Sequence, residues 1–229
     1  MADATRDIPR IGDLIDLEGL PYPDLVRRVD VAPWEALNYL DDFFLGFVFN
    51  THVATPSGAY IDGNVSIGEG SVIEPGAVIF GPTVIGKNCR VRSGATIRGS
   101  VVIGDNCVIG HASEIKHSIL FRGCQVAHFN YVGDSILGNR AHLAAGAIIA
   151  NVRIAGGTVT VRAREERVDT GLVKFGAVLG DDAEIGCNAV LNPGSIIGKN
   201  SIVYPLVSWR GILSSGMIAK SAEICVLRV

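Results

Sequence analysis

A six-residue repeat of aliphatic side chains constrains the fold of this chain more than any other feature. The repeat passes without interruption through ten positions: Ile61, Ile67, Ile73, Ile79, Ile85, Val91, Ile97, Ile103, Ile109 and Ile115. Six residues turn an α-helix through more than one and a half turns, so these side chains cannot share a helical face. A fixed short period is typical of a solenoid, and its hexapeptide form predicts a β-helix in which three short strands make a triangular coil of about 18 residues.

Small side chains lie two positions before the repeat. They are Val65, Ser71, Ala77, Thr83, Cys89, Ala95, Val101, Cys107 and Ser113. A narrow triangular prism has room for only small residues at its inner corners. We therefore interpret Cys89 and Cys107 as small core residues and not as reactive thiols.

The repeat is irregular in three places. Between Ile115 and Leu137 its interval shortens twice, from six residues to five. It stops at 150–176, where TVTVRA and RVDTGLV alternate β-prone residues, so this segment is predicted to leave the coil as a hairpin-containing excursion loop. The tail 204–229 is less regular and is expected to add one or two strands.

Residues 1–50 have a different character from the repeat region. They contain Trp34, one of the two tryptophans, and Pro33 precedes an apolar pattern typical of a helical face. That pattern consists of Trp34, Leu37, Leu40 and Leu45. Because the open end of a solenoid exposes apolar surface and strand edges, we predict a short helical N-terminal cap over a β-helix at 51–229.

Composition excludes several classes of function. The chain has 229 residues, a net charge of −3 and 19% charged residues, which does not favour nucleic acid or an acidic membrane surface as a partner. No apolar run is long enough for a spanning helix, and the first residues do not resemble a signal peptide. The five cysteines are dispersed and form no CxxC pair, which favours reduced thiols, a cytoplasmic location and no bound metal.

Polar residues interrupt the repeat mainly within 114–151. This stretch contains EIK at 114–116, AHFNYVGD at 127–134 and AGAIIAN at 145–151. In their order and spacing these runs resemble the acetyltransferase domain of the bifunctional N-acetylglucosamine-1-phosphate uridyltransferase/glucosamine-1-phosphate acetyltransferases. The excursion, with the run VDTGLVKFGAVLGDD at 168–182, resembles the archaeal-type members of this group more closely.

The resemblance implies a fold, an assembly and a reaction. The fold is an all-β, single-stranded, left-handed parallel β-helix, although crossovers between parallel strands are otherwise right-handed. The assembly is a homotrimer whose sites lie between adjacent subunits. The reaction is transfer of an acetyl group from acetyl-CoA to the amine of an amino-sugar 1-phosphate, with glucosamine 1-phosphate as the first expectation.

The resemblance also assigns roles to charged and titratable residues. It implies that His128 is the general base, and that Arg98 and Lys116 bind the sugar phosphate. These residue types suit the chemistry. A histidine titrates near neutrality and can accept a proton from the attacking amine, and convergent cations bind a phosphate dianion.

Further roles come from the same resemblance. Tyr131 and Asn151 would contact the amino sugar, and Lys174, on the excursion, would close over it from a neighbouring subunit. The backbone N–H of Ala145 would face the thioester oxyanion, because a positioned donor stabilises a tetrahedral intermediate. His111 and His117 are interpreted as turn or core residues, and Gly133 and Asp134 as a turn.

The sequence departs from this family at three points. His142 stands where the family has asparagine, on the sugar side, and Cys187 stands where it has a small hydroxyl residue, on the coenzyme side. The segment 1–50 is too short for a nucleotide-binding domain and lacks a glycine-rich phosphate loop, so we expect no uridyltransferase activity. The alternatives are an acyltransferase for another amino or nucleotide sugar and a non-catalytic trimeric scaffold.

Overall fold

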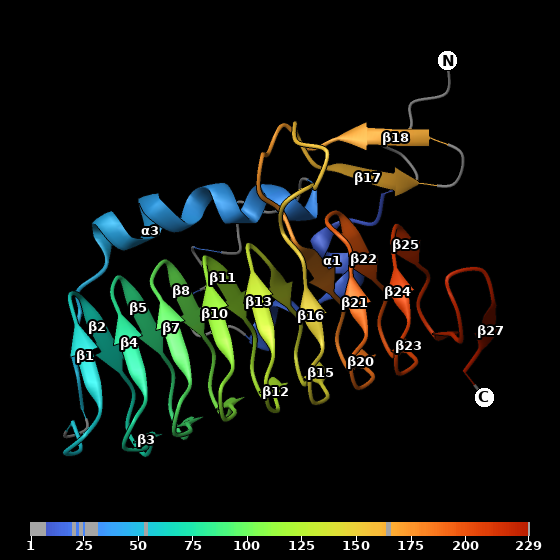
Figure 1. Cartoon of the computed structure of the whole chain (residues 1–229). Coiled ribbons are helices and arrows are strands. Elements are labelled where there is room, and N and C mark those ends of the chain that lie inside the picture. Colours follow the sequence, from blue (N-terminus) through green and yellow to red (C-terminus); the bar gives the residue numbers. More distant parts are fainter. Residues whose placement is uncertain are drawn as a thin grey trace.

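The protein, described here by a computed structural model, folds into a triangular β-helix (Figure 1). The structure describes residues 8–19, 22, 25, 32–52, 55–163 and 166–228. Parts of the predicted cap, and residues 164–165 of the excursion, therefore lie outside the described residues. The all-β class and the left-handed parallel β-helix with a helical N-terminal segment are confirmed.

Three parallel sheets form the three faces of the prism. Sheet 1 consists of β1 (Tyr60–Asp62), β4 (Val78–Phe80), β7 (Thr96–Arg98), β10 (Glu114–Lys116), β13 (Tyr131–Gly133), β16 (Ile148–Ile149), β21 (Val190–Leu191) and β24 (Ser208–Trp209). Sheet 2 consists of β2 (Val65–Ile67), β5 (Thr83–Ile85), β8 (Val101–Ile103), β11 (Ser118–Leu120), β14 (Ile136–Leu137), β19 (Ala177–Leu179), β22 (Ser195–Ile197) and β25 (Ile212–Leu213). Sheet 3 consists of β3 (Val72–Ile73), β6 (Arg90–Val91), β9 (Val108–Ile109), β12 (Gln125–Val126), β15 (His142–Leu143), β20 (Glu184–Ile185), β23 (Ile202–Val203), β26 (Met217–Ala219) and β27 (Cys225–Leu227).

The aliphatic repeat sets the register of every sheet. Each strand pairs with the strand one coil further on, so Ile61 lies beside Ile79 and Ile79 beside Ile97. The repeat residues from Ile67 onward are buried and form one continuous core. The small residues are buried as well, and the thiol of Cys107 contacts the carbonyl oxygen of Phe121 at 3.0 Å. The tail adds four strands, more than the one or two predicted, because the coil continues through β24 to β26 before it ends in β27, which pairs antiparallel with β26.

The two shortened intervals correspond to tight turns from sheet 1 to sheet 2, along what we call the upper edge of sheet 1. His117 and Asp134 each make this turn with a left-handed backbone, at φ 45° and 48°. Histidine and aspartate are among the non-glycine residues that tolerate this region. The excursion leaves at the same edge one coil later, between β16 and β19. The irregular positions of the repeat are therefore stacked in successive coils.

The N-terminal segment covers the outer side of sheet 2, not the open end of the coil. It contains α1 (Ile11–Leu14), the 3₁₀ helices η2 (Leu17–Gly19) and η3 (Pro33–Tyr39), and α3 (Leu40–Gly46). Outward-facing residues of sheet 2, such as Val102 and Ile136, are fully buried and share a cluster with this segment. An apolar outer face needs a cover along its whole length, which explains the lateral position.

The helical face is partly as predicted. Trp34, Leu37 and Leu40 are buried, whereas Leu45 is 87% exposed and Phe44 takes the inward position. The prediction for Leu45 is wrong because Leu40 and Leu45 both lie in α3, where a separation of five residues places two side chains about 140° apart around the helix axis. Phe44, four residues after Leu40, lies on the buried face instead.

The excursion folds as the predicted hairpin. β17 (Thr160–Ala163) and β18 (Glu166–Asp169) pair antiparallel. Val159 and Val161 pack into the cluster over sheet 2, and the rings of Phe175 and Trp34 lie 6.0 Å apart. The excursion and the N-terminal segment therefore share one apolar cluster, and Figure 1 shows α3 and the hairpin of β17 and β18 above the coil.

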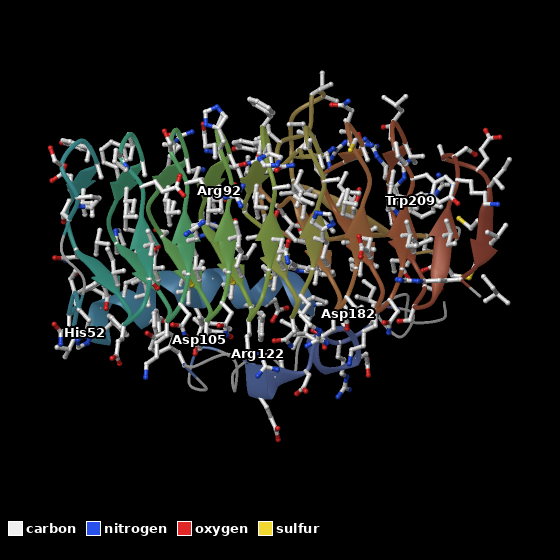
Figure 2. All side chains as sticks on the ribbon, turned by 90° about the horizontal axis from the view of Figure 1, so that it is seen from below. His52, Arg92, Asp105, Arg122, Asp182 and Trp209 are labelled. Carbon is white, nitrogen blue, oxygen red and sulfur yellow. The ribbon has the colours of Figure 1, made fainter. Side chains whose placement is uncertain are left out.

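A polar row follows the edge between sheets 2 and 3. Figure 2 shows Asp105, Arg122 and Asp182 along this edge and Arg92 on the opposite one. The buried Asp181 fixes the N-terminal segment here, because its carboxylate accepts hydrogen bonds from the backbone N–H of Asp16 at 2.7 Å and from Asn139. This edge is structural and is separate from sheet 1.

Trp34→Ala is expected to lower the free energy of unfolding by about 3 to 5 kcal/mol, because it leaves a cavity in the layer over sheet 2. Leu45→Ala, in the same helical segment but exposed, should change it by less than about 0.5 kcal/mol. Urea unfolding of both variants measures the difference. Equal effects would contradict the buried position of Trp34.

Candidate functional site

Sheet 1 is bordered by two rows of turns. Along its lower edge, where the chain passes from sheet 3 to sheet 1, four turn residues are stacked in successive coils: His111, His128, Ala145 and Cys187. Backbone hydrogen bonds hold this column together: Phe129 N–H to His111 O at 2.9 Å, Gly146 N–H to His128 O at 2.9 Å, and Asn188 N–H to Ala145 O at 3.0 Å. His128 and Ala145 are thus neighbours on one edge.

The imidazole of His128 is half-buried and makes no hydrogen bond to any of the described residues. By contrast, Nδ1 of His111 lies 2.6 Å from the carbonyl oxygen of Ser93. The turn itself is fixed by the buried Asn130, whose amide donates to Ala144 O at 2.7 Å and to Ala147 O at 3.1 Å. His128 is therefore held on a rigid turn with both ring nitrogens available.

Sequence reasoning gave Asn130 no role. The structure shows that it ties the turn of His128 to the turn of Ala145, in the next coil. Its position one residue before β13, where a core-facing amide needs internal partners, is the signal that could have revealed this function.

The backbone N–H of Ala145 is available to a ligand. Ala144 N–H donates to Ile185 O at 2.8 Å and Gly146 N–H donates to His128 O, but no described residue accepts from Ala145 N–H. Among the residues that the structure describes, the backbone N–H groups of His128 and Cys187 at the same turn position also have no acceptor, so this feature recurs along the edge. The exposed thiol of Cys187 lies one coil beyond Ala145.

Cations lie on the strands of sheet 1. The guanidinium of Arg98 donates to the carboxylate of Glu114 at 2.7 Å, and this hydrogen bond raises the pKa of Arg98. Lys116 occupies the next coil at the end of β10. Tyr131 begins β13 and lies beside Glu114 in the register. Three of the predicted site residues therefore occupy adjacent strands.

A cluster centred on the buried Asp134 lies at the upper edge. Its carboxylate lies 3.7 Å from Nζ of Lys116 and accepts a hydrogen bond from the amide of Asn151. Oδ1 lies 2.9 Å from Nδ1 of His117, although the contact lacks the direction of a hydrogen bond. Sequence reasoning interpreted His117 and Asp134 only as turn or core residues. The turn is confirmed, but it also brings the predicted sugar and phosphate contacts together.

Asp134 is charged despite its burial. Burial alone would raise the pKa of this carboxyl group, but the contacts from His117 and Asn151 and the positive charge of Lys116 outweigh it and lower the pKa. The carboxylate therefore persists at neutral pH as a fixed negative centre beneath the upper edge.

Tyr131 lies close over the backbone of Gly133. A Cβ at Gly133 would come within 2.7 Å of the phenol oxygen of Tyr131 and 2.8 Å of the amide nitrogen of Asn151. Burial raises the pKa of Tyr131, and the charge of Asp134 raises it further, so the phenol stays protonated and can donate a hydrogen bond. A larger residue at position 133 would therefore have to displace the ring of Tyr131 and the amide of Asn151.

The stem of the excursion joins the cluster. Phe175 N–H donates to Asn151 O at 2.9 Å, and Val152 forms an antiparallel bridge with Lys174. Gly176 N–H donates to the backbone oxygen of Asp134 at 2.8 Å. The exposed Lys174 therefore lies on a stem that is fixed directly above Asp134.

The structure groups most of the predicted residues but not all of them. Arg98, Lys116, Tyr131, Asn151 and Lys174 lie on sheet 1 or at its upper edge, and His128, Ala145 and Cys187 lie at its lower edge. His142 is on sheet 3 instead, where Nδ1 lies 3.0 Å from Oε2 of Glu184. Within one protomer it belongs to a different face of the prism.

The described residues contain no cluster of three histidine, cysteine or acidic side chains suited to a metal ion. Nor does this part of the chain include a helix long and apolar enough to cross a membrane.

Comparison with known proteins shows what this chain is similar to. Residues 79–173 match the family profile described as the GMPPB C-terminal domain. The bifunctional protein GlmU of Methanococcus maripaludis (strain C7) is 40% identical over 203 residues, which are 89% of this chain and 48% of that protein. The bifunctional sugar-1-phosphate nucleotidylyltransferase/acetyltransferase of Sulfurisphaera tokodaii is 34% identical over 90 residues, 39% of this chain and 22% of that protein.

Among solved structures, LpxA of Bacteroides fragilis, a UDP-N-acetylglucosamine acyltransferase, superposes with a TM-score of 0.53 at 17% identity. The match covers 72% of this chain and 70% of that one, and it shows the fold alone. The chain is thus a hexapeptide-repeat, left-handed β-helix protein. Its resemblance to the acetyltransferase part of the bifunctional sugar-1-phosphate enzymes is confirmed. The chain spans half or less of the length of these curated relatives.

The low pKa of Asp134 predicts how stability depends on pH. A lowered folded-state pKa stabilises the fold above the unfolded value, and the contribution is lost as the pH falls through the folded-state value. Asp134→Asn should therefore lower stability by about 1 to 3 kcal/mol at pH 7, and the difference from wild type should shrink below about pH 4. Thermal unfolding from pH 7 to pH 3 measures it. A pH-independent difference would contradict the charged state, and Asp62→Asn, an exposed change on β1, is the control.

Proposed function

We propose that this chain transfers an acetyl group from acetyl-CoA to the amine of an amino-sugar 1-phosphate, with glucosamine 1-phosphate as the first acceptor. One observation carries the proposal: sheet 1 is bordered by an unpaired imidazole and a free N–H on one edge, and by a cationic, amide-containing cluster on the other. The Sulfurisphaera tokodaii relative is named a bifunctional sugar-1-phosphate nucleotidylyltransferase/acetyltransferase, which agrees with the proposal.

The proposed reaction is a direct transfer. The neutral amine attacks the carbonyl carbon of the thioester, and His128 takes a proton from the nitrogen. The N–H of Ala145, one coil further on, donates to the oxygen that becomes negative in the tetrahedral intermediate. The carbon–sulfur bond then breaks, and the proton passes from His128 to the departing thiolate, so that coenzyme A leaves as a thiol and the enzyme is regenerated.

The upper edge supplies the acceptor contacts. Lys116 and Arg98 would bind the phosphate, Tyr131 and Asn151 would contact the amino sugar, and Lys174 would close over that sugar. Arg98 is paired with Glu114 in the free protein, so phosphate binding would exchange one anionic partner for another. Acetyl-CoA, as a co-substrate, would lie along the lower edge beside Ala145 and Cys187.

The proposal includes a homotrimer, as the family resemblance implies. Sheet 1 of one protomer would face a neighbour, whose Lys174 would reach the site. His142 on sheet 3 would then meet an acceptor that is bound between two protomers. Sedimentation velocity can test the oligomeric state, which is a part of this proposal.

The pair of His142 and Glu184 favours a second candidate. The carboxylate of Glu184 lies at Nδ1 of His142, so the ring presents Nε2 to a ligand, which differs from the amide expected at this position. The acceptor could therefore be another amino sugar or a nucleotide sugar with a hydroxyl group at that place. Thiol release from acetyl-CoA with glucosamine 1-phosphate, galactosamine 1-phosphate and no acceptor distinguishes the two candidates.

His128→Ala is expected to lower kcat/KM by about 100-fold or more, because it removes the general base. His111→Ala is the matched control, since His111 occupies the same turn one coil earlier and is bound to a carbonyl oxygen. It should leave the rate unchanged. Full activity in His128→Ala would refute the base assignment, and equal losses in both variants would indicate general damage to the edge.

A further inference from the structure

We propose that Asp134 is a positioning residue that holds Lys116, Asn151 and the stem of the excursion as one unit for acceptor binding. This inference rests on the proposed function and adds to it a residue that would not touch the substrate. It explains why a buried carboxylate occupies an edge whose other residues are assigned to an anionic ligand.

Asp134 makes contacts in three successive coils. The side chain of Asp134 contacts Lys116 and His117 in the coil before it and Asn151 in the coil after it. Its backbone N–H donates to Lys116 O at 3.0 Å, and its backbone oxygen accepts from Gly176. One residue thus fixes both the entry of the excursion, at Asn151, and its exit, at Gly176.

The charge of Asp134 acts strongly on its neighbours because the carboxylate is buried. Asp134 is only 4% exposed, so its negative charge is poorly screened by water. A carboxylate that a phosphate cannot reach still orients the ammonium of Lys116 at its outer side and keeps the amide of Asn151 turned in one direction. Pairing beneath the surface fixes the geometry of the cation without blocking its exposed side.

The short turn between β13 and β14 sets the position of the Asp134 carboxylate. The shortened interval leaves a single left-handed residue, Asp134, between β13 and the buried Ser135. A longer turn would move the carboxylate outward and separate it from Asn151. The same shortening at His117, one coil earlier, brings that side chain against Asp134.

The test compares Asp134→Asn with Asp181→Asn. Asp181 is also a buried, hydrogen-bonded carboxylate at a turn, but it fixes the N-terminal segment on the opposite edge. Asp134→Asn should raise the KM for glucosamine 1-phosphate by about 10- to 100-fold and leave the KM for acetyl-CoA unchanged. Asp181→Asn should lower the melting temperature and leave both KM values unchanged.

Hydrogen exchange supplies a readout that does not need catalysis. The amides of Phe175 and Gly176 should exchange faster in Asp134→Asn than in wild type, and remain protected in Asp181→Asn. Unaltered protection in Asp134→Asn, or an unchanged acceptor KM, overturns the positioning role. A wild-type protein that transfers no acetyl group overturns the proposed function instead, and the exchange result then decides the anchoring of the stem by itself.

Discussion

The in-register stacking of aliphatic side chains inside the prism is the constraint on which the rest of the structure depends. Because strands repeat every coil with parallel pairing, a residue at a given place in one coil has a neighbour at the same place in the next, as Ile79 and Ile97 show. This regularity turns separate loops into continuous edges. His128 and Ala145 are neighbours for that reason alone, and so are Lys116 and Asp134. The site is therefore a product of register, not of any single loop.

The departures from the repeat are the second determinant. Two shortened turns, at His117 and Asp134, and one long insertion all fall on the upper edge of sheet 1 in three successive coils. A regular solenoid has identical edges and offers a ligand nothing distinctive. Here one edge carries a buried carboxylate, an ammonium group and the stem of a hairpin, while the opposite edge carries an unpaired imidazole. The two edges lie on either side of strands only two or three residues long.

Much of this could be predicted from the sequence, and the limits have physical reasons. The period gave the β-helix, and the motif runs gave the residues of sheet 1, because both are encoded in local spacing. The place of the N-terminal segment could not be predicted, since Val102 and Ile136 face outward at positions that a repeat analysis treats as exposed. The prediction for Leu45 failed because Leu45 lies five residues after Leu40 in α3, a separation that does not keep two side chains on one face of an α-helix. The role of Asp134 depended on contacts among three coils, and His142 was separated from the others by the corner of the prism.

The central claim is that the acceptor lies across sheet 1, with its amine toward His128 and its phosphate toward Lys116. A crystal structure with coenzyme A and glucosamine 1-phosphate tests this directly. The account predicts the phosphate beside Lys116 and Arg98, the amine nitrogen within hydrogen-bonding distance of the His128 ring, and the coenzyme thiol beside Ala145. An acceptor bound on sheet 3 at His142 and Glu184, with sheet 1 empty, would contradict it.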